Sequence, residues 1–161
     1  MIFVAVGTQF AFDRLIKAVD TWLIANHQQG VAQIAEGDYL PQAMQWQRFM
    51  DMPTFNQHFN EADLIISHAG MGNIITALEG QKPIIVMNRQ HALGEHRNDH
   101  QADGLAWMAK LPGVYTAQTE AELHALLDQR HNLTAAPITT QTRRQALVDF
   151  LDQTLQTRLA L

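Results

Sequence analysis

Runs of apolar residues alternate with helical patterns along most of the chain. Residues 2–6 (IFVAV) form an unbroken β-prone run, which is typical of a strand buried on both faces. Residues 12–27 carry apolar side chains at helical spacing and predict an amphipathic helix. The same order returns further on, because residues 64–67 predict a strand and residues 73–79 predict a helix.

The remaining predicted elements also alternate between strand and helix over most of the chain. Further strands are predicted at residues 84–87 and 114–116 and, more weakly, at 31–35 and 45–50. Residues 53–60 predict a short helix or a loop, and residues 97–110 predict a helix. Thr119 and Glu122 have capping-box spacing, so a helix should run to about Gln129. Alternating strands and helices with buried strands imply an α/β fold, a parallel sheet with helices on both faces, in the Rossmann-like manner.

The composition narrows the class of protein. With 161 residues and 47% hydrophobic residues, we expect one globular domain at 1–135 and an amphipathic helix within 136–161 that packs on it or docks on a partner. The 11 Lys and Arg residues are scattered among 16 Asp and Glu residues, which argues against nucleic acid as a partner. The chain has no cysteine and so no disulfide, which fits a reducing compartment such as the cytosol, and no run reaches the ~18 apolar residues of a membrane span.

The loops that follow strands are the candidate sites, because ligands of such sheets bind outside the carboxyl ends of the strands. Two of these loops stand out: Gly7-Thr8-Gln9, and His68-Ala69-Gly70-Met71-Gly72-Asn73. In the second loop, glycines let backbone N–H groups approach an anion, and the helix N-terminus adds positive partial charge, so a diphosphate fits. The alternative is that Gly70 and Gly72 only form a tight turn. The spacing matches neither GxGxxG nor a Walker A motif.

Histidines offer further candidate chemistry. His68 is a candidate catalytic base, a phosphate ligand, or a histidine satisfied by backbone groups beside the strand end. His96 and His100 are four residues apart, as zinc ligands on a helix can be, but neither an HExxH motif nor a cysteine accompanies them. A polar segment that reads sugar hydroxyls suits residues 95–101 better. We therefore expect no metal and no cofactor.

Three segments carry a family resemblance: VAVGTQFAFDRLIKAVD, ADLIISHAGMGNIITALEGQKPIIVM and LGEHRNDHQ. Residues 1 to about 110 resemble the C-terminal, nucleotide-sugar-binding half of family 28 glycosyltransferases, which have the GT-B fold. The likeness extends to the small subunits of split enzymes, namely the dolichol-linked N-acetylglucosamine transferase and the PssE-type exopolysaccharide glycosyltransferases. The third segment favours the PssE type.

The resemblance implies roles for individual residues. It places Gly7, Thr8 and Gln9 beside the diphosphate and the acceptor, and His68, Ala69, Gly70, Met71, Gly72 and Asn73 around the phosphates. Backbone near Phe49 and Met50 would bind uracil, and Asp99, His100 and Gln101 would read the donor sugar. Thr76 stands where relatives commonly have a glutamate that grips the ribose hydroxyls, so the ribose should be held by a weaker hydrogen bond.

These roles lead to one functional hypothesis with two alternatives. The chain would be the donor-binding subunit of a two-component UDP-sugar hexosyltransferase of exopolysaccharide or cell-surface polysaccharide synthesis, with a lipid-linked acceptor. The resemblance implies a membrane-associated PssD-type partner, which would recruit this cytoplasmic chain to the inner face of the membrane. Because the chain has room only for the donor half, we expect activity only with that partner, and possible homodimers without it. The alternatives are a non-catalytic regulatory subunit and a nucleotide-sugar epimerase.

Overall fold

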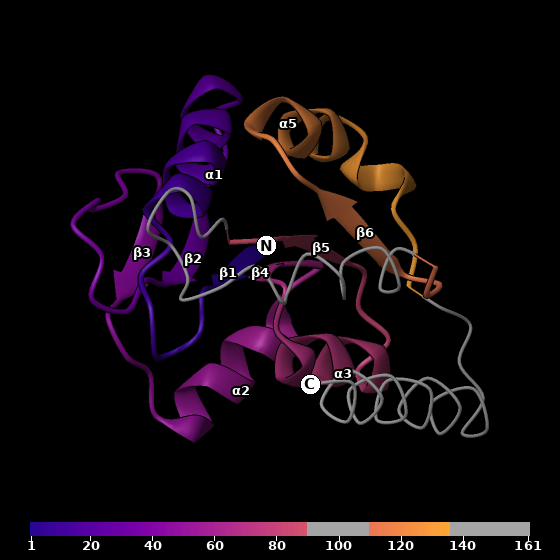
Figure 1. Cartoon of the computed structure of the whole chain (residues 1–161), viewed down its shortest axis with the longest axis horizontal. Coiled ribbons are helices and arrows are strands. Elements are labelled where there is room, and N and C mark those ends of the chain that lie inside the picture. Colours follow the sequence, from indigo (N-terminus) through magenta and orange to yellow (C-terminus); the bar gives the residue numbers. More distant parts are fainter. Residues whose placement is uncertain (90–109, 136–161) are drawn as a thin grey trace, which may run out of the picture.

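The computed structural model describes residues 1–89 and 110–135, and the other residues are drawn as a grey trace in Figure 1. Within these ranges, six parallel strands form one sheet in the order β3-β2-β1-β4-β5-β6. The strands are β1 (Ile2–Ala5), β2 (Gly30–Gln33), β3 (Met44–Gln47), β4 (Leu64–His68), β5 (Ile84–Met87) and β6 (Val114–Ala117). The parallel sheet confirms the predicted α/β class.

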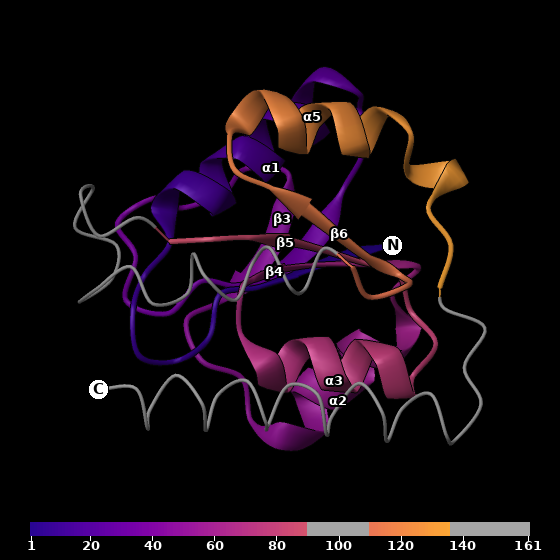
Figure 2. The ribbon, with the colours of Figure 1, turned by 45° about the vertical axis from the view of Figure 1, so that its right-hand side comes forward.

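Helices cover both faces of the sheet. They are α1 (Asp13–Ala25), α2 (Met52–Glu61), α3 (Met71–Glu79), α5 (Glu120–Asp128) and the short 3₁₀ helix η2 (Arg130–Asn132). Figure 2 shows α1 and α5 above the sheet and α2 and α3 below it. The three-layer, Rossmann-like arrangement is therefore the one that the sequence predicted.

The central strand β1 explains why its sequence is apolar without alternation. Ile2 and Val4 belong to the core cluster on the side of α1 and α5, whereas Phe3 and Ala5 belong to the cluster on the side of α2 and α3. All four side chains are buried. A strand packed on both faces needs apolar residues at every position, and this accounts for the IFVA run.

Side-chain caps explain where two of the helices, α2 and α5, begin. Asp51 Oδ1 accepts a hydrogen bond of 2.8 Å from Thr54 N, so residues 53–60 belong to a capped helix rather than a loop. The hydrogen bonds from Thr54 lower the pKa of the Asp51 carboxyl. The predicted cap at Thr119 is confirmed, because its hydroxyl accepts from Glu122 N at 3.1 Å.

One predicted boundary is wrong in a way that matters for the site. The helix expected to start at Asn73 starts at Met71, with Gly70 as its N-cap residue. Gly72 therefore lies inside the first turn of α3 rather than in a loop before it. The cause is that glycine in the sequence pattern indicated a turn, although a first helical turn tolerates glycine. The helix predicted at 97–110 and the unit at 136–161 fall outside the described ranges, apart from residue 110.

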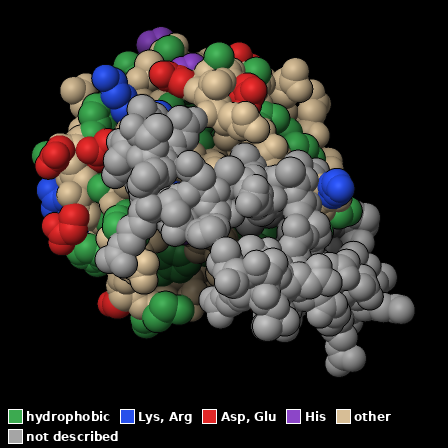
Figure 3. All heavy atoms as spheres, viewed as in Figure 1, with side chains coloured by type: hydrophobic (Ala, Val, Ile, Leu, Met, Phe, Trp, Pro, Cys, Tyr) green, Lys and Arg blue, Asp and Glu red, His purple; other side chains and the backbone are tan. Residues whose placement is uncertain are grey.

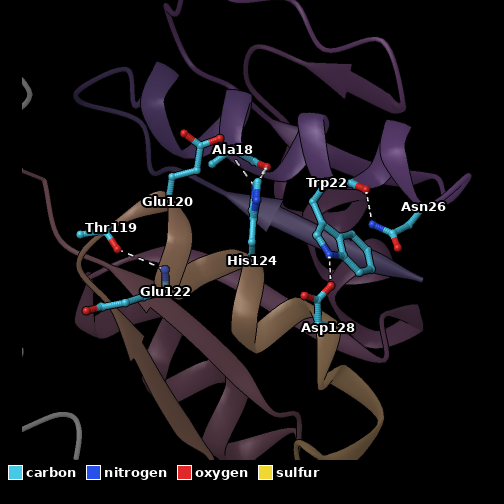
Figure 4. A network of polar contacts seen from close by, with 8 residues as sticks. All are labelled: Ala18, Trp22, Asn26, Thr119, Glu120, Glu122, His124 and Asp128. Atoms are coloured by element: carbon cyan, nitrogen blue, oxygen red, sulfur yellow. Dashed lines mark hydrogen bonds and ion pairs between the residues drawn. The ribbon is translucent and has the colours of Figure 1, made fainter.

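Helix α5 is attached to α1 by the polar contacts in Figure 4. The buried Trp22 indole donates a hydrogen bond of 2.8 Å to Asp128 Oδ1, and His124 Nε2 lies 2.8 Å from the Ala18 carbonyl oxygen. The Arg130 guanidinium lies 4.9 Å from the centre of the Trp22 ring. Trp22 thus joins the two helices that cover one face of the sheet.

We predict that Trp22→Phe lowers the free energy of unfolding by about 1 to 2 kcal/mol, because it removes one hydrogen bond and part of a buried ring. Urea unfolding followed by circular dichroism measures this change. Asp128→Ala removes the same hydrogen bond but keeps the ring, so it should cost less. Equal stability of Trp22→Phe and the wild type would contradict this account of the interface.

A buried carboxylate orders the segment before β3. Asp20 is fully buried and accepts hydrogen bonds from the Tyr39 hydroxyl at 2.6 Å and from the Ala43 amide at 2.8 Å. It also accepts from the Gln42 amide at 3.0 Å. Burial of the phenol, followed by its hydrogen bond to Asp20, raises the pKa of Tyr39 from 10.0 to about 12.

The raised pKa of Tyr39 predicts that the stability of the fold depends on pH in the alkaline range. The folded chain holds the Tyr39 proton more tightly than the unfolded chain, so the resulting stability is complete below pH 10 and is lost as the pH rises towards about 12. We expect the ultraviolet titration of Tyr39→Phe to lack a step near pH 12 that the wild type has. Superimposable titration curves of the two proteins would contradict this prediction.

Among the coloured side chains of Figure 3, which belong to the described residues, Lys and Arg lie apart from one another and form no basic patch on this face. Within residues 1–89 and 110–135, no helix is long and apolar enough to cross a membrane.

Candidate functional site

The candidate loops meet at the point where the strand order reverses. From β1 the chain moves outward through β2 to β3, and then returns to β4 on the other side of β1. In the pairing of β1 with β4, Ala5 lies opposite Ser67. Gly7 and Ala69, two residues further along, therefore leave the sheet side by side. A reversal of this kind opens a crevice at the carboxyl ends of the strands, which is the usual ligand position in such sheets.

The imidazole of His68 fills the space between the two loops. A Cβ atom added to Gly7 would lie 3.0 Å from His68 Cε1, and one added to Gly70 would lie 2.2 Å from His68 Nε2. Gly7 also has a φ of 82°, in the left-handed region that favours glycine. Glycine is therefore favoured at both positions, at Gly7 by its backbone conformation and the ring, and at Gly70 by the His68 ring alone. His68 Nδ1 lies 3.4 Å from the Ala5 carbonyl oxygen, which favours a proton on Nδ1.

Gly72 differs from these two glycines. It is exposed in the first turn of α3, and among residues 1–89 and 110–135 no atom lies within 4 Å of the Cβ that an alanine would add there. Its φ is outside the left-handed region. Glycine in a helix costs about 1 kcal/mol relative to alanine, and neither the backbone geometry nor packing among the described residues gives a reason for a glycine here. The open space beside Gly72 leaves its backbone accessible to a ligand.

The N-terminus of α3 is suited to binding an anion. The first amides of a helix, here those of Met71, Gly72 and Asn73, have no partner within the helix. Gly70 at the N-cap has no side chain that could accept from them, and the first turn contains no acidic residue. Positive partial charge at this end of α3 therefore remains available to an anionic ligand.

Hydrogen bonds to β4 fix the direction of α3. Asn73 Nδ2 donates to the hydroxyl of the fully buried Ser67 at 2.9 Å, and that hydroxyl donates to the His68 carbonyl oxygen at 2.7 Å. The backbone amide of Ala69 is also in use, because it donates to the Met87 carbonyl oxygen at 3.0 Å. The side-chain nitrogen of Asn73 thus serves the fold, and its backbone amide is the group directed to the helix N-terminus.

Thr76 lies one turn further along α3. Its hydroxyl donates a hydrogen bond of 2.8 Å to the Gly72 carbonyl oxygen, which occupies its only proton. The oxygen of Thr76 can still accept a hydrogen bond. It is therefore suited to accept from a ligand hydroxyl and not to donate to one.

The predicted uracil segment lies at the same edge of the sheet. Phe49 is 46% exposed, and the Met50 amide donates a hydrogen bond of 2.8 Å to the side chain of the buried Gln33. A base bound here would have to use groups other than that amide. Three strand spacings separate β3 from β4, roughly 14 Å at ~4.8 Å each, and a ligand that touches both must bridge that distance.

For the other predicted site residues, the structure shows only exposure or gives no description. Thr8 and Gln9 are exposed after β1, whereas Asp99, His100, Gln101 and His96 fall outside the described residues. The described ranges contain no cluster of three or more metal-ligating side chains. A hollow of about 380 Å³ lies between the amino ends of β2 and β3, at the opposite edge of the sheet, and is therefore separate from this site.

The family of the chain follows from its similarity to known proteins. The glycosyltransferase family 28 C-terminal domain matches residues 1–154, almost the whole chain. The chain belongs to this family. The resemblance seen in its three sequence segments is therefore confirmed, and the parallel sheet with its switch point between β1 and β4 is the scaffold of a family 28 C-terminal domain.

Relatives of this family 28 domain include UDP-N-acetylglucosamine transferase subunit ALG13 of Homo sapiens, 30% identical over 107 residues, and of Mus musculus, 30% identical over 110 residues. These matches cover 60% and 59% of this chain but only 9% of each relative. A solution structure of ALG13 has a TM-score of 0.64 at 20% identity and covers 91% of this chain and 93% of its own. The glycotransferase of kitacinnamycin has a TM-score of 0.58 at 16% identity, covering 90% of this chain and 38% of its own.

Sequence reasoning missed one residue of this family 28 domain, Arg89. Its guanidinium is buried at the edge where the candidate loops meet, and it donates hydrogen bonds to the carbonyl oxygens of Val6 and Phe10. The signal was available, because Arg89 is the second residue after β5 and residues after strands are the candidate site residues in such a sheet.

Proposed function

We propose that this chain is the donor-binding subunit of a two-component UDP-sugar glycosyltransferase and the donor half of a GT-B enzyme. Its family and the transferase subunits among its relatives support the proposal. The donor would lie along the carboxyl edge of the sheet, with uracil near Phe49 and Met50 and with the diphosphate at the N-terminus of α3. The segment with Asp99, His100 and Gln101 would read the sugar.

Gly72 is the single observation that carries the proposal. A helix start without a side-chain cap or an acidic residue can bind an anion, but many helices have such starts. A glycine that neither backbone geometry nor packing among the described residues requires is more specific, because it keeps space open directly over the first amides of α3. The diphosphate group of a UDP-sugar is the anion that would suit this position.

The chemistry needs little from this chain beyond charge stabilisation. A hydroxyl oxygen of the acceptor would form a bond to the anomeric carbon, and the bond from that carbon to the diphosphate oxygen would break. The amides of Met71, Gly72 and Asn73 would stabilise the negative charge on the departing UDP. The proton of the acceptor hydroxyl would pass to a base, for which a group of the partner and His68 are the candidates.

The second component would hold the acceptor. We propose a membrane-associated partner of PssD type, a lipid-linked saccharide acceptor and a role in exopolysaccharide or cell-surface polysaccharide synthesis. The partner would recruit this chain to the inner face of the membrane.

Titration calorimetry with UDP, UDP-glucose, UDP-glucuronate and UDP-N-acetylglucosamine tests the proposal, first with this chain and then with a co-expressed partner. Tighter binding of one UDP-sugar identifies the donor. Binding that occurs only with the partner means that two subunits complete the site. Absence of binding in both preparations would contradict donor binding.

The second candidate function is a non-catalytic regulatory subunit. Thr76 favours this second function. Its hydroxyl proton is already donated to the Gly72 carbonyl oxygen, so Thr76 would bind the ribose of a UDP-sugar only weakly. Transferase assays of the complex separate the two functions. Donor binding for catalysis predicts loss of activity in Gln101→Ala and His68→Ala, whereas a regulatory subunit predicts retained activity.

A further inference from the structure

Arg89 is a buried cation that donates hydrogen bonds to the loop between β1 and α1. The residue is only 4% exposed, and a guanidinium keeps its charge in proteins, so its burial is costly unless hydrogen bonds compensate for the lost water. Nη2 donates to the Phe10 carbonyl oxygen at 2.6 Å and also to the Val6 carbonyl oxygen. The guanidinium carbon lies 5.1 Å from the centre of the Phe12 ring. All three contacts are with the segment between β1 and α1.

The two carbonyl groups flank the candidate tripeptide Gly7-Thr8-Gln9. Val6 comes directly before Gly7, and Phe10 comes directly after Gln9. Between them, Gly7 lies against the His68 ring, but Thr8 and Gln9 are exposed, so these two residues have little packing of their own to hold them. Two charge-assisted hydrogen bonds from one nitrogen fix both ends of the stretch at once.

We propose that Arg89 is a positioning residue that holds Gly7-Thr8-Gln9 at the proposed donor site. Arg89 follows β5, whereas the tripeptide follows β1, and β4 lies between these strands in the sheet. The guanidinium therefore reaches across the end of β4, whose His68 ring packs against Gly7. The positioning role rests on the proposed function, because it matters for catalysis only if the tripeptide lies beside the diphosphate and the acceptor.

Arg14 offers a matched control. Its guanidinium carbon lies 5.3 Å from the centre of the same Phe12 ring, and it donates to the carbonyl oxygens of Asn88 at 2.9 Å and Gln118 at 3.3 Å. These two hydrogen bonds tie the ends of β5 and β6 rather than the tripeptide. Arg14→Met thus removes a neighbouring guanidinium from the same ring without removing either bond to Val6 or Phe10.

The experiment compares Arg89→Met, Arg89→Lys and Arg14→Met with the wild type in the full chain. Backbone ¹⁵N relaxation gives the order parameters of Thr8 and Gln9, and calorimetry gives the dissociation constant for UDP. For Arg89→Met we expect order parameters to fall from about 0.85 to below about 0.6 and UDP affinity to fall about fivefold. Arg89→Lys should recover part of both, since lysine keeps the charge and can donate two hydrogen bonds. Arg14→Met should change neither.

The outcomes separate this inference from the proposed function. Rigid Thr8 and Gln9 in Arg89→Met, or equal loosening in Arg14→Met, would overturn the positioning role whether or not UDP binds. If the wild type does not bind UDP but the order parameters change as expected, the positioning role stands and the donor-binding proposal fails. If Arg89→Met does not fold, Arg89→Lys decides by the same order parameters, and wild-type values in that variant would overturn the role.

Discussion

Gly72→Ala should weaken UDP binding at least tenfold while the chain stays at least as stable as the wild type. The added methyl group meets no atom of the described residues within 4 Å, so their packing does not oppose it. Alanine is also the better helix former, by up to about 1 kcal/mol. The same methyl group would project into the space through which an anion approaches the first amides of α3. A tenfold loss of affinity corresponds to about 1.4 kcal/mol.

Calorimetry with UDP and thermal unfolding of the same samples measure the two effects of Gly72→Ala. Asn56→Ala is a suitable control, since residue 56 is exposed on a different helix, α2, and the change also introduces an alanine into a helix. It should leave UDP affinity unchanged. If Gly72→Ala lowered stability without changing affinity, glycine at this position would serve the fold, and the diphosphate site would lose its main support.

Gly70→Ala should lower the free energy of unfolding by about 2 kcal/mol, in the range that overpacking commonly costs. Gly70 has a φ of −109° and a ψ of 131°, an extended conformation that alanine adopts without strain. The cost must then come from the His68 ring, because the added Cβ would lie 2.2 Å from Nε2. Removing the ring should remove most of the cost.

A double-mutant cycle tests this origin by urea unfolding of Gly70→Ala, His68→Ala and the double variant. We expect a coupling of at least about 1 kcal/mol, as found for residues in contact. Gly7→Ala is the contrasting case, because its φ of 82° keeps an alanine strained even after the ring is gone. Additive costs of Gly70→Ala and His68→Ala would mean that His68 does not explain the glycine.

The sequence predicted the architecture well because parallel sheets leave a strong pattern. The IFVA run of β1 and the IIVM run of β5 are buried at every position, and neither could belong to a strand with one wet face. Edge strand β3 was predicted more weakly for a physical reason. Met44 is its buried residue, while Gln45, Trp46 and Gln47 are exposed, so its sequence lacks that pattern.

The site was predicted in position but not in its detail. The rule that ligands bind after strands identified the loops at Gly7 and His68, and the switch point between β1 and β4 places them together. Sequence spacing could not show that the three glycines differ. Gly7 and Gly70 contact the His68 ring, whereas Gly72 faces open space, and that distinction depends on three-dimensional contacts. The same rule points to Arg89 after β5, but its partners are backbone carbonyl groups, so no sequence motif marked it out from its neighbours.

The most direct test of the proposed diphosphate site is a ¹H–¹⁵N correlation spectrum of the chain titrated with UDP, with uridine as the control that lacks phosphate. We predict that UDP shifts the amide signals of Met71, Gly72 and Asn73 more than those of any other residues of β4, α3 or β5, and that uridine leaves these three signals nearly unchanged. Binding of UDP that shifts other amides while these three stay in place would contradict the site.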